Sequence, residues 1–223
     1  DVCSSDLTGR PLILNWEQEH VPAILNVWFG GSEAGPAIGD VLFGAVNPGG
    51  KLTMTFPKSV GQIPLYYAHK NTGRPLKEGK WFEKFRSNYL DVDNDALYPF
   101  GYGLSYTTFR FSDITLNRSS IGMDNELVAS VTVTNTGDRA GSEVVQLYIR
   151  DLVGSVTRPV KELKGFEKIY LQPNESRTVR FTIAPEMLKF YNADLKFVAE
   201  PGDFDVMIGP DSRNVKTARF TLH

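Results

Sequence analysis

Alternation of apolar and polar positions dominates the second half of the chain. Between Thr108 and His223, short runs with a period of two recur, and turn sequences such as Asn135-Thr136-Gly137 separate them. Successive strand residues point to opposite faces of a sheet, so this pattern predicts strands that are buried on one side. Seven or eight such strands without a long helix are typical of an immunoglobulin or fibronectin III sandwich. We expect a first strand over residues 109–116, marked by Phe109, Phe111, Ile114 and Leu116, and further strands at residues 127–133, 144–149, 163–171, 177–183, 196–200, 204–208 and 217–222.

The first part of the chain has a different pattern. Residues 11–15 and 23–29 are apolar runs that predict buried strands. Ser32 is a suitable helix N-cap, and apolar residues then recur at helical spacing from position 37 to position 45. Residues 51–56 alternate again and predict another strand. The order of strand, helix and strand indicates part of an α/β domain.

Residues 57–107 show little periodicity. They contain four prolines and many aromatic residues. A segment of this length without regular structure is usually a functional loop or a linker. Its aromatic rings favour packing across neighbouring surfaces over a freely moving linker.

Composition and charge narrow the possible partners. The formal net charge is −2, the pI is about 6.0, and the 24 lysines and arginines are spread along the chain. Nucleic-acid binders usually carry a basic face, so we expect no nucleic-acid partner. No run of 18 apolar residues is present, so we expect no membrane partner. Cys3, the single cysteine, cannot form an intramolecular disulfide or a thiolate zinc site.

The N-terminus resembles a cut within a domain. Residues 1–6 have neither the basic region nor the apolar region of a signal peptide. The first structured pattern begins almost at once, at Gly9.

The turn Gly30–Ala34 has the strand-to-helix context of a serine-hydrolase nucleophile elbow. That turn needs a glycine two residues after the serine, and Ala34 occupies this position. The later histidines are His69 and the terminal His223, so a helix N-cap role is favoured for Ser32. Glu33 lies where an open α/β sheet places ligands, but it also suits the start of a helix, which we favour.

Two further patterns carry alternative interpretations. Asp91–Asp95 spaces three carboxylates as a calcium loop begins, but Ala96 stands where such loops have glycine, so a solvated turn is favoured. Trp81 and Phe82 lie among charged residues, including Lys77 and Glu78, and could stack on pyranose rings. Packing between domains explains these two aromatic residues equally well.

From Thr8 onward, the chain resembles the C-terminal part of glycoside hydrolase family 3, the β-glucosidases that end in a fibronectin type III-like domain. The segment from Tyr89 to Phe109, with its Tyr98–Ser105 core Tyr-Pro-Phe-Gly-Tyr-Gly-Leu-Ser, is the most distinctive. The other matching segments are Gly9–Leu12, Ala23–Trp28, Glu33–Gly44, Asn47–Leu52, Thr55–Pro64, Val133–Gly137, Gly141–Tyr148 and Arg158–Phe166.

The resemblance implies an α/β fragment followed by an all-β sandwich. It implies that residues 1–70 end an α/β sandwich domain, that residues 71–107 are a linker wrapping back over it, and that residues 108–223 are the fibronectin type III-like domain. In this family, an upstream barrel carries the aspartate nucleophile, and the glutamate acid/base also precedes Gly9. We therefore assign no catalytic residue to this chain, and we expect it to be inactive by itself.

The resemblance also implies a reaction and a setting. The parent would hydrolyse terminal non-reducing β-D-glucosyl residues with retention and without a cofactor or metal. The polar side chains of His69, Lys70, Asn71 and Arg74 suit sugar hydroxyls, and we predict that the Tyr66–Arg74 loop binds substrate. Expected partners are a β-glucoside or oligosaccharide held through the missing barrel, and a second copy in a homodimer of the parent. Family habit places the parent in the periplasm or outside the cell.

An alternative interpretation is a non-catalytic carbohydrate- or surface-binding module. We further predict that residues 8–56 are poorly stable in isolation, because truncated sheets leave apolar faces and strand edges uncovered. The sandwich is expected to fold by itself.

Overall fold

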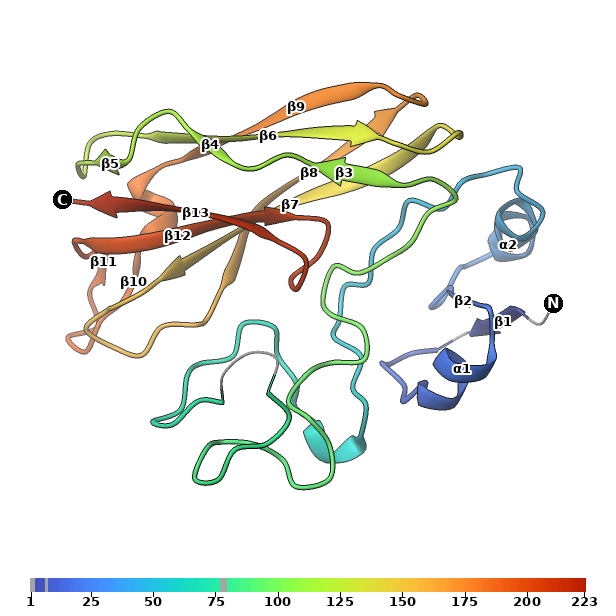
Figure 1. Cartoon of the computed structure of the whole chain (residues 1–223), viewed down its shortest axis with the longest axis horizontal. Coiled ribbons are helices and arrows are strands. Elements are labelled where there is room, and N and C mark those ends of the chain that lie inside the picture. The colour runs from blue at the N-terminus through green and yellow to red at the C-terminus, as the bar shows by residue number, and fades with distance from the viewer. Residues whose placement is uncertain (1–2, 7, 77–79) are drawn as a thin grey trace.

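The computed structural model describes residues 3–6, 8–76 and 80–223 (Figure 1). The N-terminal part is small. Strands β1 (Cys3–Asp6) and β2 (Ala23–Asn26) pair in parallel, with helix α1 (Asn15–His20) between them in the chain. Helix α2 (Ala34–Leu42) follows, and a 3-10 turn η1 (Val60–Gln62) begins the long connection. Figure 1 shows these elements beside the larger β structure.

The α/β character is confirmed, but two local predictions are wrong. Residues 11–14 form no strand, and α1 begins at Asn15, so the second of the predicted strands is the only one of that pair that forms. Ser32 does not cap α2. The N-cap position belongs to Glu33, whose side chain makes no capping hydrogen bond.

Residues 51–56 do not form a regular strand, contrary to the prediction, because the backbone bends at Thr53 and Met54 and forms only an isolated bridge at Phe56. Their partner is the segment 97–102, which lies about 45 positions further along the chain. Leu52 N donates to Tyr102 O at 2.7 Å, and Phe56 N donates to Tyr98 O at 2.9 Å. Phe56 is buried in this pairing, whereas Met54 is 49% exposed, so the alternation of this segment does not correspond to one buried face.

Two sheets form the all-β part, as the alternation predicts. One sheet has the order β5-β13-β12-β7-β8. In the other sheet, β9 pairs along one edge of β6, and β3 and β4 pair with successive parts of its opposite edge. β10 and β11 form a separate hairpin that follows the 3-10 turn η2 (Pro185–Leu188). The strands are β3 (Phe109–Phe111), β4 (Thr115–Leu116), β5 (Ser120–Ile121), β6 (Leu127–Asn135), β7 (Gly141–Asp151), β8 (Glu162–Leu171), β9 (Ser176–Ile183), β10 (Phe190–Tyr191), β11 (Phe197–Val198), β12 (Gly202–Gly209) and β13 (Lys216–Leu222).

The core lies between these sheets. On β6, buried and partly exposed positions alternate over the whole strand, and its apolar residues meet those of β7 and β12 across the sandwich. Phe204 and Phe220 stack at 5.4 Å between ring centroids on neighbouring strands. The contiguous apolar cluster explains why the period of two is so regular here, since one face of each sheet must be apolar throughout.

The connection 57–107 packs onto the sandwich through buried polar groups. Gln146 Nε2 on β7 donates to Gly101 O at 3.2 Å and to Pro210 O at 2.5 Å. Gly101 has a φ of +82°, and a Cβ there would lie 2.1 Å from the Gln146 amide oxygen. Glycine is therefore required by both the backbone conformation and the close approach. The end of the aromatic-rich segment near Gly101 is thus fixed on the sandwich.

Candidate functional site

The four predicted substrate-binding residues lie together in one exposed loop. His69 O accepts a hydrogen bond from Val160 N at 2.9 Å, and Lys70 forms an isolated bridge with Pro159. At the end of the loop, Arg74 O accepts a hydrogen bond from Ser87 N at 2.9 Å. Only backbone groups make these contacts.

Three side chains of this loop are available to a ligand, whereas Thr72 Oγ1 lies 2.6 Å from Ser87 Oγ and is already paired. Among the described residues, no hydrogen-bond or ionic partner is found for the side chains of Lys70, Asn71 and Arg74. His69 Nδ1 lies 3.4 Å from Lys70 O, a weak local contact. The structure gathers the predicted residues in one loop, and whether they bind substrate stays a prediction.

Tyr67 anchors the start of the loop to the sandwich. Its ring stacks on Phe100 with 4.4 Å between centroids and meets the edge of Tyr148 at 5.8 Å. Its hydroxyl accepts a hydrogen bond from Leu163 N at 3.3 Å. Tyr148 donates to Gln146 Oε1 at 2.6 Å, and burial raises the pKa of its hydroxyl well above the usual value. The start of the loop is therefore fixed by the packing of Tyr67 on Phe100 and Tyr148.

Arg158 anchors the strand connection with which the loop pairs. Its guanidinium lies 2.9 Å from Glu162 and 3.4 Å from Asp151, and its central carbon lies 4.0 Å above the Phe190 ring. Burial raises the pKa of Asp151, although the Arg158 charge acts in the opposite direction. Because Pro159 and Val160 follow directly, this cluster fixes the segment that holds His69 and Lys70.

Arg158 begins one of the segments that resemble the family, but its anchoring role was not predicted from the sequence. The signal available was an arginine before a proline, between two acidic positions, in a long strand connection. Such a pattern does not reveal the ring of Phe190, which comes from a distant element.

An aromatic group lies further along the same connection. Trp81, Phe82 and Phe85 are all substantially exposed, and Phe85 is the most exposed at 72%. The Trp81 and Phe82 rings are 6.5 Å apart, and Lys84 Nζ lies 4.9 Å from the centroid of Phe85. Lys77 and Glu78, named beside them in the sequence, lie outside the described residues. Exposed rings of this kind favour surface contact over internal packing.

The serine-hydrolase alternative receives no support from the geometry. Among the described residues, no histidine makes a hydrogen bond with Ser32. His20 instead stacks on Trp16, at 4.7 Å between ring centroids. Glu33 is exposed at the start of α2, as a helix-start charge would be.

The geometry does not support the calcium alternative either, because the central carboxylate of the acidic stretch is already paired. Both carboxylate oxygens of Asp93 accept from Lys58 Nζ, at 2.7 and 2.8 Å, and one also accepts from Asp95 N. In the described part of the chain, no group of three or more His, Cys, Asp or Glu side chains is placed to hold a metal ion. The acidic stretch is a turn that an ion pair joins to Lys58.

No helix in the described ranges is long and apolar enough to cross a membrane.

Two family models match the chain. Residues 6–106 match the glycosyl hydrolase family 3 C-terminal domain, and residues 143–212 match the fibronectin type III-like domain. The two matches occur in the order that the sequence motifs imply.

Relatives match nearly the whole chain. A periplasmic beta-glucosidase of Salmonella typhimurium is 55% identical over 216 residues, and a beta-xylosidase of Formosa agariphila is 44% identical over 218 residues. Both alignments cover 97% of this chain, but only 28% and 29% of those proteins. A crystal structure of a beta-glucosidase from Listeria innocua in complex with glucose superposes with a TM-score of 0.94 at 43% identity, covering 99% of this chain and 30% of that one.

The chain thus spans less than a third of the length of these relatives. Its two matched domains, its order of motifs and its close structural superposition agree. The chain belongs to glycoside hydrolase family 3 and corresponds to the C-terminal portion of its β-glucosidases, including the fibronectin type III-like domain.

Proposed function

We propose that this chain is part of a retaining β-glucosidase that hydrolyses terminal non-reducing β-D-glucosyl residues. The observation that supports this most strongly is the 55% identity, over 97% of the chain, to a protein named periplasmic beta-glucosidase. The name of that relative also supports a periplasmic or extracellular location for the whole protein.

The chemistry of this reaction needs two carboxyl groups and no cofactor. One carboxylate attacks the anomeric carbon as the leaving oxygen takes a proton from the second carboxyl group. The second group then removes a proton from water, which attacks the same carbon and releases the sugar. We assign neither role to an acidic residue of this chain, because no pair of its carboxylates matches the catalytic motifs of the family.

The contribution of this chain is then to shape the rim of the sugar pocket. The Tyr66–Arg74 loop offers His69, Lys70, Asn71 and Arg74 as hydrogen-bonding groups, while Tyr67 and the Arg158 cluster hold its backbone. It would approach the active site of its own subunit or of a second copy in a homodimer. The predicted boundary at residue 107 would separate this loop from the sandwich, whereas the predicted boundary at residue 70 falls within the loop.

Turnover of a chromogenic β-glucoside tests the activity. The chain by itself should show none, whereas the longer protein from the same reading frame should be active. The corresponding β-xyloside is the specificity control, since relatives named beta-xylosidase share 44% identity. Robust turnover by this chain alone would show that its catalytic pair has been misplaced.

Arg74→Ala in the longer protein tests the loop. Losing one charged hydrogen bond to substrate should raise KM about tenfold, with kcat changed less. Arg110→Ala on β3 is the matched control, because Arg110 is exposed on the sandwich. An unchanged KM in the Arg74 variant would remove the loop from the substrate site.

A non-catalytic glycan-binding module is the second candidate. The exposed rings of Trp81, Phe82 and Phe85 favour it, because such rings stack on pyranose faces. Binding of this chain to immobilised β-glucans that is lost in Trp81→Ala would support this candidate.

A further inference from the structure

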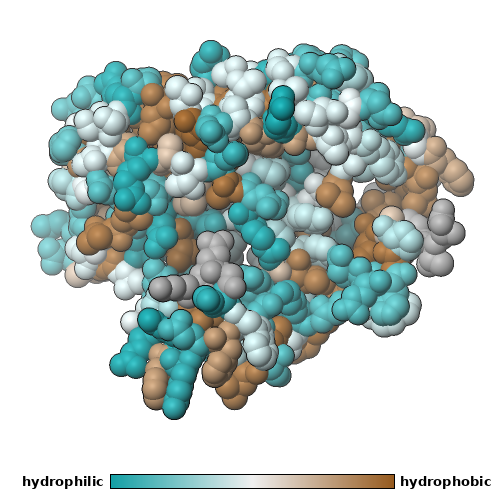
Figure 2. All heavy atoms as spheres, in the orientation of Figure 1, coloured by the Kyte–Doolittle hydropathy of each residue, from teal (hydrophilic) through white to brown (hydrophobic). Residues whose placement is uncertain are grey.

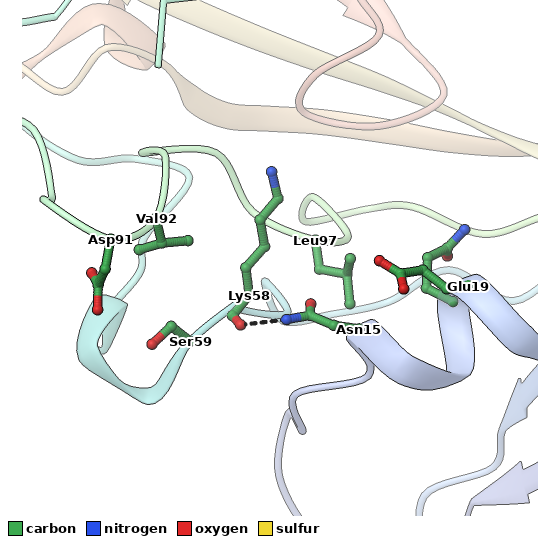
Figure 3. A pocket seen from close by; sticks show the side chains of 8 residues that line it. Asn15, Glu19, Lys58, Ser59, Asp91, Val92 and Leu97 are labelled. Atoms are coloured by element: carbon green, nitrogen blue, oxygen red, sulfur yellow. Dashed lines mark hydrogen bonds between the residues drawn. The ribbon is translucent and has the colours of Figure 1, made fainter. Parts of the chain in front are cut away.

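Two adjoining hollows form a groove where three parts of the chain meet. Their volumes are about 370 and 330 Å3, and both are lined by Gln18, Lys58 and Leu97. The first extends towards Asp91, and the second reaches Asn214 in the turn between β12 and β13. Figure 3 shows the first hollow, with Ser59 and Asp91 on one side and with Asn15 and Glu19, from α1, on the other. Each hollow has the volume of a small-ligand site.

The floor of this groove is fixed by internal bonds. Lys58 Nζ pairs with Asp93 at 2.7 Å, and Asn15 Nδ2 donates to Lys58 O at 2.8 Å. The fully buried Gln62 accepts from Lys58 N at 2.7 Å and donates to Asp93 O and Asp95 O. A ligand would therefore meet a preorganised surface and would lose little affinity to ordering of the protein.

One wall of the groove is aromatic. Tyr98 and Tyr102 stack with their ring planes 16° apart and their centroids 5.3 Å apart. The Tyr98 hydroxyl donates to Gln18 Oε1. That bond orients the Gln18 amide, whose nitrogen has no partner among the described residues. An amide nitrogen oriented in this way can donate a hydrogen bond to a ligand hydroxyl group.

The charges around the groove are mixed. Glu19, Asp91 and Asp95 have no ion-pair partner within the described ranges. Lys58 is neutralised by Asp93, and Arg213 Nη2 donates to Ala96 O at 2.5 Å. A phosphate or sulfate would be repelled by these carboxylates, and the described residues offer no group of three or more His, Cys, Asp or Glu side chains that could hold a metal ion.

We propose that this groove binds a neutral, hydroxyl-rich ligand, namely a mono- or disaccharide. Sugar hydroxyls both donate and accept, so they can satisfy carboxylates, amides and cations in the same site. This site shares no lining residue with the Tyr66–Arg74 loop and does not depend on the proposed hydrolysis. It would serve as an accessory sugar site of the C-terminal portion.

Titration of the chain with glucose and with cellobiose, followed by NMR and calorimetry, tests this site. We expect saturable binding of at least one sugar, with shifts at Gln18, Tyr98 and Tyr102, and no binding of inorganic phosphate or Ca²⁺. Gln18→Ala should weaken affinity about five- to tenfold, because one hydrogen bond is lost. Gln172→Ala, in an exposed turn between β8 and β9, is the matched control and should leave affinity unchanged.

Two variants separate this groove from other sugar sites. Asp95→Asn keeps the shape of the groove and removes one strong acceptor, so it should also weaken binding. Trp81→Ala should leave sugar binding to the groove unchanged. Absence of saturable binding, or binding lost in Trp81→Ala but kept in both groove variants, would overturn the proposal while leaving the proposed β-glucosidase activity untouched.

Discussion

The sandwich and the N-terminal α/β part bury their apolar residues to very different extents. In the sandwich, the inward side chains of both sheets form one contiguous buried cluster. In residues 8–56, Leu14 and Phe56 are the buried apolar side chains, whereas Phe29 and Phe43 are 82% and 91% exposed. Figure 2 shows hydrophobic residues at the surface on the right of the view, where Figure 1 places α1 and α2.

The difference shows that one part of this chain buries its own apolar faces, whereas the other part leaves them exposed. The sandwich satisfies its strands within itself, because each sheet covers the apolar face of the other. The parallel pair of β1 and β2 is a two-stranded sheet, which is marginal in water without further strands. The exposed apolar side chains of the α/β part are of the kind that a larger domain would cover.

Hydrogen exchange should reveal the largest contrast between the two parts. Amides of β6, β7 and β12 should be protected at least about 1,000-fold more than those of α1, β2 and α2, because core strands open only by global unfolding. Mass spectrometry after a time course in D2O measures this difference. Equal protection of both parts would show that the α/β part is stabilised by contacts other than apolar burial.

Replacing an aromatic residue by alanine should destabilise the protein much more in the sandwich than in the α/β part. Phe204→Ala removes a ring that is 1% exposed, and it should lower the free energy of unfolding by about 3–5 kcal/mol. Phe29→Ala should change it by less than about 0.5 kcal/mol, since that ring is already in solvent. Urea denaturation of both variants, followed by circular dichroism, gives the values. A large loss in the Phe29 variant would contradict the comparison.

Arginine variants extend the comparison to charged groups. Arg158→Ala leaves Asp151 buried without its cation and removes the contact with Phe190, so it should cost about 3 kcal/mol. Arg177→Ala is the matched control, because its pair with Glu175 spans 3.8 Å at the surface and contributes less than about 1 kcal/mol. Thermal unfolding of both variants tests this order, and similar midpoints would refute it.

The smallest expected effect is a pair of opposite pH dependences. Asp151 has a raised pKa, chiefly through burial, so it binds its proton more tightly in the folded state. Its contribution to stability therefore falls as pH rises from below 3.8, the unfolded value, to above the folded pKa. Hydrogen bonds from Ser155 lower the pKa of Glu200, so its contribution is present above 4.5 and falls as pH drops through the folded pKa.

Unfolding of wild type, Asp151→Asn and Glu200→Gln between pH 3 and pH 7 measures these two terms. The difference between wild type and Asp151→Asn should become less favourable to wild type as pH rises. The difference between wild type and Glu200→Gln should change in the opposite direction. Slopes of the same sign would contradict the roles assigned to burial and to the Ser155 hydrogen bonds.

The sequence predicted the sandwich well and the α/β part less well. The alternation on Leu127–Val133 gave β6 almost to the residue, because a half-buried strand has no other way to keep one face apolar. Residues 11–15 were wrongly predicted as a strand, since a short apolar run looks the same in a strand and in a loop beside a helix. The loop carrying His69, Lys70, Asn71 and Arg74 was located correctly as a connection, but its anchors were not found.

The sequence by itself determined the family, the order of the domains and the strands of the sandwich, because these depend on local motifs and on a period of two. Only the tertiary structure decided that residues 51–56 pair with 97–102, that Arg158 holds the connection paired with the Tyr66–Arg74 loop, and that Gln18 meets Tyr98 in a groove. These contacts join residues that are far apart in the chain. No local pattern records such pairings, since each is selected by the packing of the complete fold.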